Sequence, residues 1–176
     1  EGNQMATQYL SGTPHSFGTH VPVGDLKIDF SYDTTRISDY TRQVDLTTGI
    51  TTVGFKVDGI GYKREYFCSN PDNVLVMRFT TDKGNSLNFE TGLALLRKAT
   101  VTAEGNELVF TGKVDYPQFG PGGVNFIGKI NIAQQGGTIE AREGKIRVKG
   151  ADEAILTLDI RTDYKNPGYR TQCAQT

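Results

Sequence analysis

Residues 39–79 read DYTRQVDLTTGITTVGFKVDGIGYKREYFCSNPDNVLVMRF, and this stretch decides the fold. Apolar and polar side chains alternate along it with a period of two, which is typical of half-buried β-strands. Asp58-Gly59 interrupts the alternation with the strongest short hairpin signal known. A two-residue turn at this point fixes the register, in which the facing pairs are Val57 and Ile60, Phe55 and Tyr62, and Val53 and Arg64.

Simple alternation fails at two positions of the second hairpin strand. Phe67 falls on the polar face, so either a β-bulge near Glu65 shifts the phase or a second layer covers both faces. The bulge is the preferred interpretation. Arg64 falls on the apolar face, where an unpaired charge is costly, so we expect a carboxylate partner, either Asp45 or Asp39.

The same alternation and regular turn signals continue along the chain. Further strands are expected at residues 25–32, 40–46, 50–57, 74–80, 87–91, 99–103, 107–112, 123–133, 136–141, 145–149 and 154–161. Residues 74–80 are apolar on both faces, which indicates a central strand. No strand–helix–strand alternation is present, so the predicted fold is all-β: an antiparallel two-sheet β-sandwich of about a dozen short strands.

Composition limits the function classes. A chain of 176 residues with a net charge of −1 predicts one domain without a basic surface for nucleic acid or anionic membrane. No apolar run is long enough to span a bilayer. Cys68 and Cys173 are either two unpaired thiols or a disulfide made in an oxidising compartment. No cofactor motif is present.

Three blocks in order carry a family resemblance: VPVGDLKIDF (21–30), the stretch from 39 to 89, and GADEAILTLDIRTDY (150–164). Together they resemble the N-terminal β-sandwich domain of glycoside hydrolase family 95, which contains α-L-fucosidases and α-L-galactosidases. The resemblance covers residues 21–164. Residues 1–20, which precede it, are polar and predict an N-terminal extension or linker with a short helix over 3–10, and the resemblance implies residues 165–176 as a tail toward a catalytic domain.

The resemblance also implies a partner and a location. Family members are exported enzymes in which an (α/α)6 barrel follows the sandwich and holds the inverting chemistry. The expected partner is therefore the catalytic barrel of the same polypeptide, and the expected location is secreted or periplasmic, with the signal peptide removed. No catalytic residue of the family carries over to this chain.

Carboxylates are the first candidates for chemistry within the chain itself. Inverting glycosidases place two carboxyl groups roughly 6.5–9.5 Å apart, and Asp159 with Asp163, or Glu65 with a cross-strand partner, fits that spacing on strands. Solvated surface acids are the simpler interpretation.

His15 and His20 are the two histidines, and a metal site would need further ligands beside them; surface histidines are the simpler interpretation.

Loops supply the remaining candidates. The aromatic loop 116–119, before the glycine-rich residues 120–123, would suit stacking on sugar rings, or its aromatics pack on the core or on a neighbouring domain. Gly136-Gly137 and residues 150–152 resemble phosphate loops, but no helix follows either, so strand turns are expected.

The prediction is a non-catalytic domain that supports a catalytic barrel; the alternative is a free-standing carbohydrate-binding or adhesion module.

Overall fold

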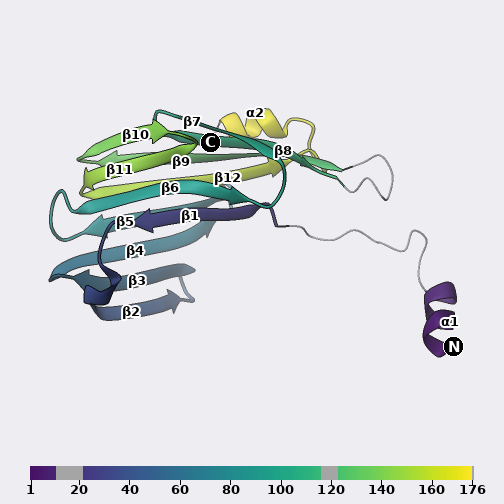
Figure 1. Cartoon of the computed structure of the whole chain (residues 1–176), viewed down its shortest axis with the longest axis horizontal. Coiled ribbons are helices and arrows are strands. Elements are labelled where there is room, and N and C mark those ends of the chain that lie inside the picture. The colour runs from purple at the N-terminus through teal and green to yellow at the C-terminus, as the bar shows by residue number, and fades with distance from the viewer. Residues whose placement is uncertain (11–21, 116–122, 176) are drawn as a thin grey trace.

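The computed structural model describes residues 1–10, 22–115 and 123–175. Twelve strands in this part of the chain form two antiparallel sheets that pack face to face (Figure 1). The predicted two-sheet β-sandwich is therefore confirmed. The expected short N-terminal helix is present as α1 (Gly2–Tyr9), which contributes no buried residue.

The larger sheet has eight strands and the smaller has four. The larger runs in the order β2 (Ile37–Asp45), β3 (Ile50–Val57), β4 (Ile60–Ser69), β5 (Val74–Thr81), β12 (Glu153–Thr162), β9 (Val124–Gln135), β8 (Glu107–Val114) and β7 (Ala99–Glu104). The smaller runs in the order β1 (Gly24–Phe30), β6 (Leu87–Leu95), β11 (Lys145–Ala151) and β10 (Thr138–Arg142). Two short helices complete the chain, η1 (Thr34–Arg36) and α2 (Tyr169–Ala174). β5 lies inside the larger sheet, as its two apolar faces predicted.

The hairpin of β3 and β4 has the predicted register. Val57 faces Ile60, and the pairing continues without a shift through Val53 and Arg64. Asp58 and Gly59 have φ angles of 52° and 78°. Two consecutive positive φ angles define the turn type whose twist matches that of the flanking strands.

The predicted bulge near Glu65 is wrong. β4 pairs with β3 and with β5 without any register shift, so Phe67 lies on the outer face of the larger sheet, 37% exposed. No described layer covers it, so the second explanation fails as well. The irregularities lie elsewhere, between Ser38 and Thr41 in β2 and between Val148 and Ala151 in β11.

The core lies between the sheets and contains two aromatic–glycine pairs. Phe110 faces Gly128 across β8 and β9, and Phe126 faces Gly112 two residues further along the same ladder. Each ring occupies the space that a side chain at the opposing glycine would fill. The other large, fully buried apolar side chains are Phe79, Phe89, Leu87, Leu108, Ile130, Ile132, Ile146, Val148 and Leu156.

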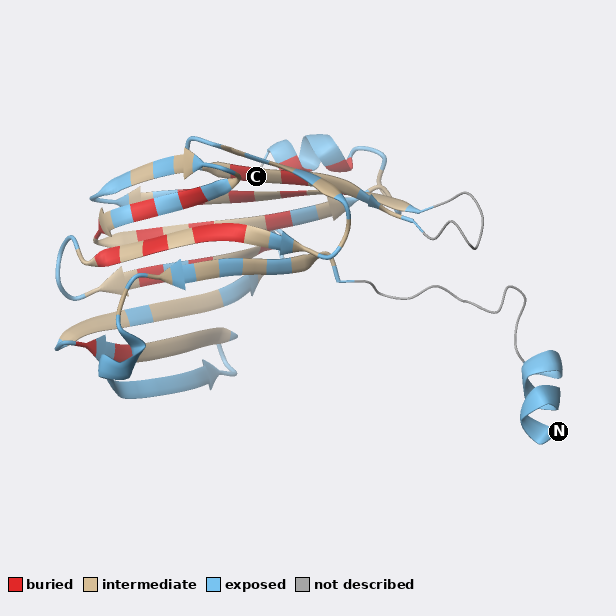
Figure 2. Ribbon diagram, in the orientation of Figure 1, coloured by how far each residue is buried: buried red, intermediate tan, exposed pale blue. Residues whose placement is uncertain are grey.

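The two sheets are aligned at one end and not at the other. β10 packs against β7, and β6 packs against β5, so the smaller sheet ends at β1, above β4 and β5 (Figure 1). β2 and β3 extend beyond it. Every residue of β2 is exposed, and Figure 2 shows this strand entirely in pale blue. We call this region, the inner face of β2, β3 and β4, the open end.

The aromatic–glycine pairing predicts that Gly128→Ala is destabilising. The new methyl group would overlap the Phe110 ring, and overpacking of this kind costs about 1–3 kcal/mol of unfolding free energy. Chemical denaturation measures it. Gly54→Ala in β3 is the matched control, since its methyl group would meet one flexible hydroxyl, that of Thr41 at 3.0 Å, and should change stability by less than about 0.5 kcal/mol. Equal losses in both variants would contradict the pairing.

Candidate functional site

The open end contains a groove of about 580 Å³. Three strands of the larger sheet form its floor, and the segment between β1 and η1 forms one wall. Its lining is rich in aromatic and β-branched side chains and contains two arginines but no acidic residue: Tyr32, Thr34, Ile37, Tyr40, Arg42, Thr51, Val53, Phe55, Arg64 and Tyr66.

Arg64 stands at the centre of this groove. Cross-strand pairing places Val53 on one side of it and Phe79 on the other. Its guanidinium carbon lies 3.9 Å from the centre of the Phe30 ring and 5.0 Å from that of Phe55, within the range of cation–π attraction. The guanidinium also donates a hydrogen bond to the Tyr32 hydroxyl. Aromatic rings, rather than a carboxylate, hold this cation.

The expected carboxylate partners of Arg64 are therefore wrong. Asp45 accepts a hydrogen bond from the backbone N–H of Thr47 at 2.8 Å, and Asp39 forms an ion pair with Lys56 at 2.8 Å. Burial lowers the pKa of the Arg64 guanidinium from its ordinary value, and Tyr66 offsets part of that effect. A lowered pKa is expected of a cation whose loss of hydration is not fully offset by nearby opposite charge or hydrogen bonds.

β2 adds exposed apolar side chains to the open end. Tyr40 is 60% exposed, Ile37 and Val44 are exposed on the same strand, and Leu46, in the turn that follows, is 92% exposed. An edge strand with this many exposed large apolar side chains is unusual in a solvated sheet and typical of an interaction surface. Alternation predicts a strand over residues 40–46 but does not mark them as a candidate site. Their excess of apolar side chains was the available signal.

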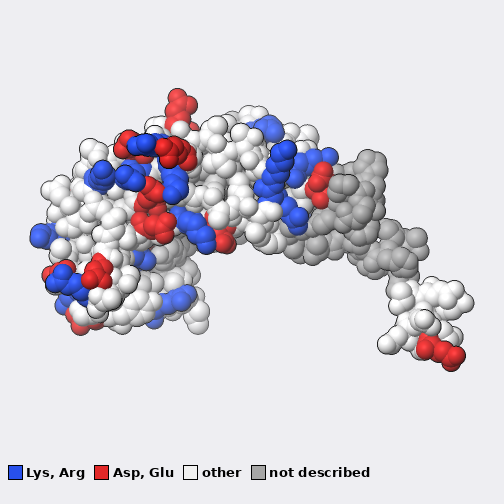
Figure 3. Space-filling view, in the orientation of Figure 1, with Lys and Arg blue, Asp and Glu red and all other residues white. Residues whose placement is uncertain are grey.

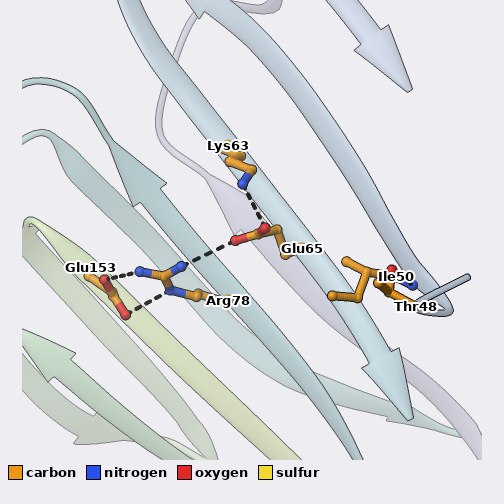
Figure 4. Close-up of polar contacts among 6 residues, drawn as sticks. All are labelled: Thr48, Ile50, Lys63, Glu65, Arg78 and Glu153. Carbon is orange, nitrogen blue, oxygen red and sulfur yellow. Dashed lines mark hydrogen bonds and ion pairs between the residues drawn. The ribbon is translucent and has the colours of Figure 1, made fainter. Parts of the chain in front are cut away.

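The carboxylate candidate Glu65 belongs to a network on the opposite, outer face of the larger sheet (Figure 4). It accepts from Lys63 at 2.6 Å and from Arg78 at 3.3 Å, and Arg78 also binds Glu153 through two hydrogen bonds of 2.9 and 2.8 Å. Arg78 holds the pKa of Glu153 below its ordinary value. A general acid for glycoside hydrolysis needs the opposite shift, so this network ties β4, β5 and β12 together instead.

Asp159 and Asp163 also have structural surroundings. Asp159 is 1% exposed and forms an ion pair with Arg161 at 2.6 Å. Asp163 accepts hydrogen bonds from the backbone and the side-chain amide of Asn125, at 2.9 and 2.5 Å, and so fastens the end of β12 to the start of β9. Each carboxylate therefore serves its own contact along or between strands.

The two cysteines are free and lie on different elements. Cys68 is exposed on β4, whereas Cys173 is buried in α2, which packs on β9 and β12 together with Tyr169. Burial raises the pKa of the Cys173 thiol, and the nearby Asp159 carboxylate adds to the shift. Of the two alternatives, the unpaired thiols are confirmed and the disulfide is wrong.

The remaining candidates are the two histidines, the aromatic loop and the two glycine motifs. His15, His20 and the aromatic loop 116–119 lie outside the described residues. In the part of the chain that the structure describes, no group of three or more His, Cys, Asp or Glu side chains could hold a metal ion. Gly136-Gly137 forms the turn from β9 to β10, and Asp152 lies between β11 and β12, so both glycine motifs are strand turns as expected.

The outer face of the smaller sheet is strongly charged with both signs. Glu90 accepts from Lys145 at 2.7 Å and from Arg147 at 2.7 Å, and these contacts lower the pKa of its carboxyl group. Figure 3 shows basic and acidic side chains interspersed in this region. Such a surface is typically solvated, in contrast to the apolar open end. No described helix is long and apolar enough to cross a membrane.

The fold is also found within a larger solved structure. A solved structure described as a kojibiose phosphorylase from the human microbiome matches 85% of this chain with a TM-score of 0.57 and 11% sequence identity. The match covers 23% of that chain. At this identity the likeness shows the fold alone.

The family follows from the sequence. The chain belongs to the N-terminal domains of glycosyl hydrolase family 65, whose family model matches residues 1–167. A protein of Arabidopsis thaliana named alpha-L-fucosidase 2 is 26% identical over 180 residues. That match covers 90% of this chain and 21% of the plant protein, so the chain spans about a fifth of that relative's length. The expected N-terminal domain of a glycoside hydrolase is confirmed, and the finer assignment to family 95 stays a prediction.

The surroundings of Arg64 predict how the chain responds to its removal. Arg64→Met should change the unfolding free energy by less than about 1 kcal/mol, because a desolvated cation without a carboxylate partner is replaced by an apolar side chain of similar length. Chemical denaturation of the 176-residue chain measures it. A loss of about 3 kcal/mol or more is the mark of a broken buried ion pair and would contradict the cation–π account.

The cysteines give a second prediction. In the folded chain at pH 7.5 a maleimide should label Cys68 and leave Cys173 unmodified, because Cys173 is buried and its raised pKa leaves little reactive thiolate. Mass spectrometry of proteolytic fragments identifies the labelled site, and unfolding in guanidinium should make both residues reactive. Equal labelling of the folded chain would show that α2 does not cover Cys173.

Proposed function

We propose that this chain is the non-catalytic N-terminal domain of an exported glycoside hydrolase of the α-L-fucosidase type, resembling family 95. The domain packs against an (α/α)6-barrel catalytic domain in the same polypeptide and stabilises it. Two observations together carry the proposal. The family model matches residues 1–167, and this chain covers only 21% of the length of the plant relative.

The chemistry of the described residues favours a structural rather than a catalytic role. Glu65, Glu153, Asp159 and Asp163 are engaged in contacts between or along strands. The described carboxyl groups with a clearly shifted pKa, those of Asp33, Asp45, Glu90 and Glu153, all have it lowered. Glycoside hydrolysis needs a carboxyl group that stays protonated near neutral pH, which is the reverse direction.

The alternative, a free-standing carbohydrate-binding module, has a weaker basis. A sugar platform presents the faces of aromatic rings to solvent, and Tyr40 at the open end has that exposure. Phe55, however, is 5% exposed and stacks on Tyr62, with ring centres 5.5 Å apart and planes at 15°. Tyr32 packs against both rings. Most of the aromatic surface beside the groove is therefore engaged within the domain.

The test uses the full-length polypeptide and the 176-residue chain side by side. The full-length polypeptide should hydrolyse 4-nitrophenyl α-L-fucoside, whereas the chain alone should not. Calorimetry should show the two parts of the full-length polypeptide unfolding in one transition, because docked domains stabilise one another. Hydrolysis by the isolated chain, or a natural polypeptide without any further domain, would contradict the proposal.

A further inference from the structure

β1 has a free edge that faces the open end. β1 pairs with β6 on one side and with no described strand on the other. Bonds from Leu96 N–H to Val23 C=O and from Ser31 N–H to Asn88 C=O show that odd-numbered residues bond to β6. In an antiparallel ladder the alternate residues then direct their N–H and C=O groups away from the partner. These outward-facing residues are Gly24, Leu26, Ile28 and Phe30, of which Phe30 offers only its N–H, because its C=O accepts from the Tyr32 N–H at 3.1 Å.

This edge differs from the opposite edge of the same sheet in what lies beneath it. At the closed end, β10 lies against β7, so both sheets end together. At the other end the larger sheet continues past β1 through β3 and β2 (Figure 1). Strands in a sheet are about 4.8 Å apart, so there is room for roughly two more strands beside β1 and above the groove.

The groove specifies the charge of its occupant. Its lining holds Arg42 and Arg64 and no acidic side chain, and neither guanidinium forms an ion pair with a described residue. Cross-strand pairing places Val53 opposite Arg42 and also opposite Arg64, so the two cations flank one apolar position. A carboxylate above Val53 would reach both and would compensate the desolvation of Arg64.

We propose that the open end receives an extended, acid-bearing segment of the same polypeptide, which adds to the free edge of β1 as a fifth strand of the smaller sheet. Main-chain hydrogen bonds to Leu26, Ile28 and Phe30 hold the segment, its apolar side chains cover Tyr40 and Val53, and a carboxylate pairs with Arg64. The inference rests on the proposed function, because the segment belongs to the part of the enzyme that this chain does not contain. It names the surface at which that part docks.

Hydrogen exchange of the full-length enzyme and of the isolated chain tests strand addition. Exchange at the Leu26, Ile28 and Phe30 amides should slow by about 100-fold or more in the full-length enzyme, because an exposed edge amide gains a main-chain acceptor. The β10 amides that face away from β11 are the matched control and should exchange equally in both proteins. The isolated chain should give the same rates across a tenfold range of concentration.

Arg64→Met, measured in both proteins, tests the carboxylate. The variant should leave the melting temperature of the isolated chain nearly unchanged and should lower that of the full-length enzyme by several degrees, since the segment's carboxylate loses its partner. Arg78→Met is the matched control: it breaks the outer-face contacts to Glu65 and Glu153 and should shift both proteins equally.

The outcomes separate the two proposals. A full-length enzyme that is active, with β1 edge amides that exchange as fast as in the isolated chain, overturns the strand and leaves the proposed function standing. Concentration-dependent protection in the isolated chain overturns it in favour of a second copy. Equal effects of Arg64→Met in both proteins overturn the carboxylate. A natural polypeptide without a catalytic domain removes the proposed function and this inference together.

Discussion

The structure depends on the burial of sheet faces by sheets of unequal width. Eight strands form one layer and four form the other, so a single hydrophobic core can enclose only part of the larger sheet. Where the layers overlap, Phe79, Phe89 and Phe110 are almost fully buried and the strands are held by side chains from both sheets. Where they do not, β2 has no buried residue. The contrast gives the domain a closed core at one end and an exposed sheet face at the other.

Charged groups follow the same division. On the outer faces, Arg78 and Glu90 each join side chains from neighbouring strands, and these solvent-screened contacts stabilise modestly. At the open end, Arg64 is held by Phe30, Phe55 and Tyr32 and has no carboxylate among the described residues. A desolvated cation in a groove without acidic side chains lacks a charged partner. The proposed docking segment would supply that partner as a carboxylate, which would account for an arginine on the apolar face of β4.

The sequence predicted the strands well because a period of two is a local property. β3 begins and ends where alternation placed it, and Asp58-Gly59 set the register of the hairpin through its two positive φ angles. The partner of Arg64 and the exposure of Phe67 could not be predicted in the same way. Alternation predicts the sheet face on which a side chain lies. Whether that face is covered depends on the width of the opposing sheet, which is set by pairing between segments distant in the sequence.

The candidate site shows the same limit. Residues on β2 and β3 were assigned to strands, but the groove they line also needs Tyr32, which reaches it from the smaller sheet's side of the sandwich. Contacts of this kind join positions whose proximity no local pattern records. Of the acids singled out as catalytic candidates, Glu65 and Asp159 lie on strands as expected, whereas Asp163 follows the end of β12. Its neighbour Asn125 follows from cross-strand pairing, which no local pattern records.

Hydroxyl-radical footprinting of Tyr40 shows whether the open end is a docking surface. Tyr40 is 60% exposed in this chain, and Phe67, 37% exposed on the outer face of the larger sheet, serves as the internal reference. Relative to Phe67, Tyr40 should be oxidised readily in the isolated chain and protected in the full-length enzyme. Equal oxidation of Tyr40 in the two proteins would contradict docking at the open end.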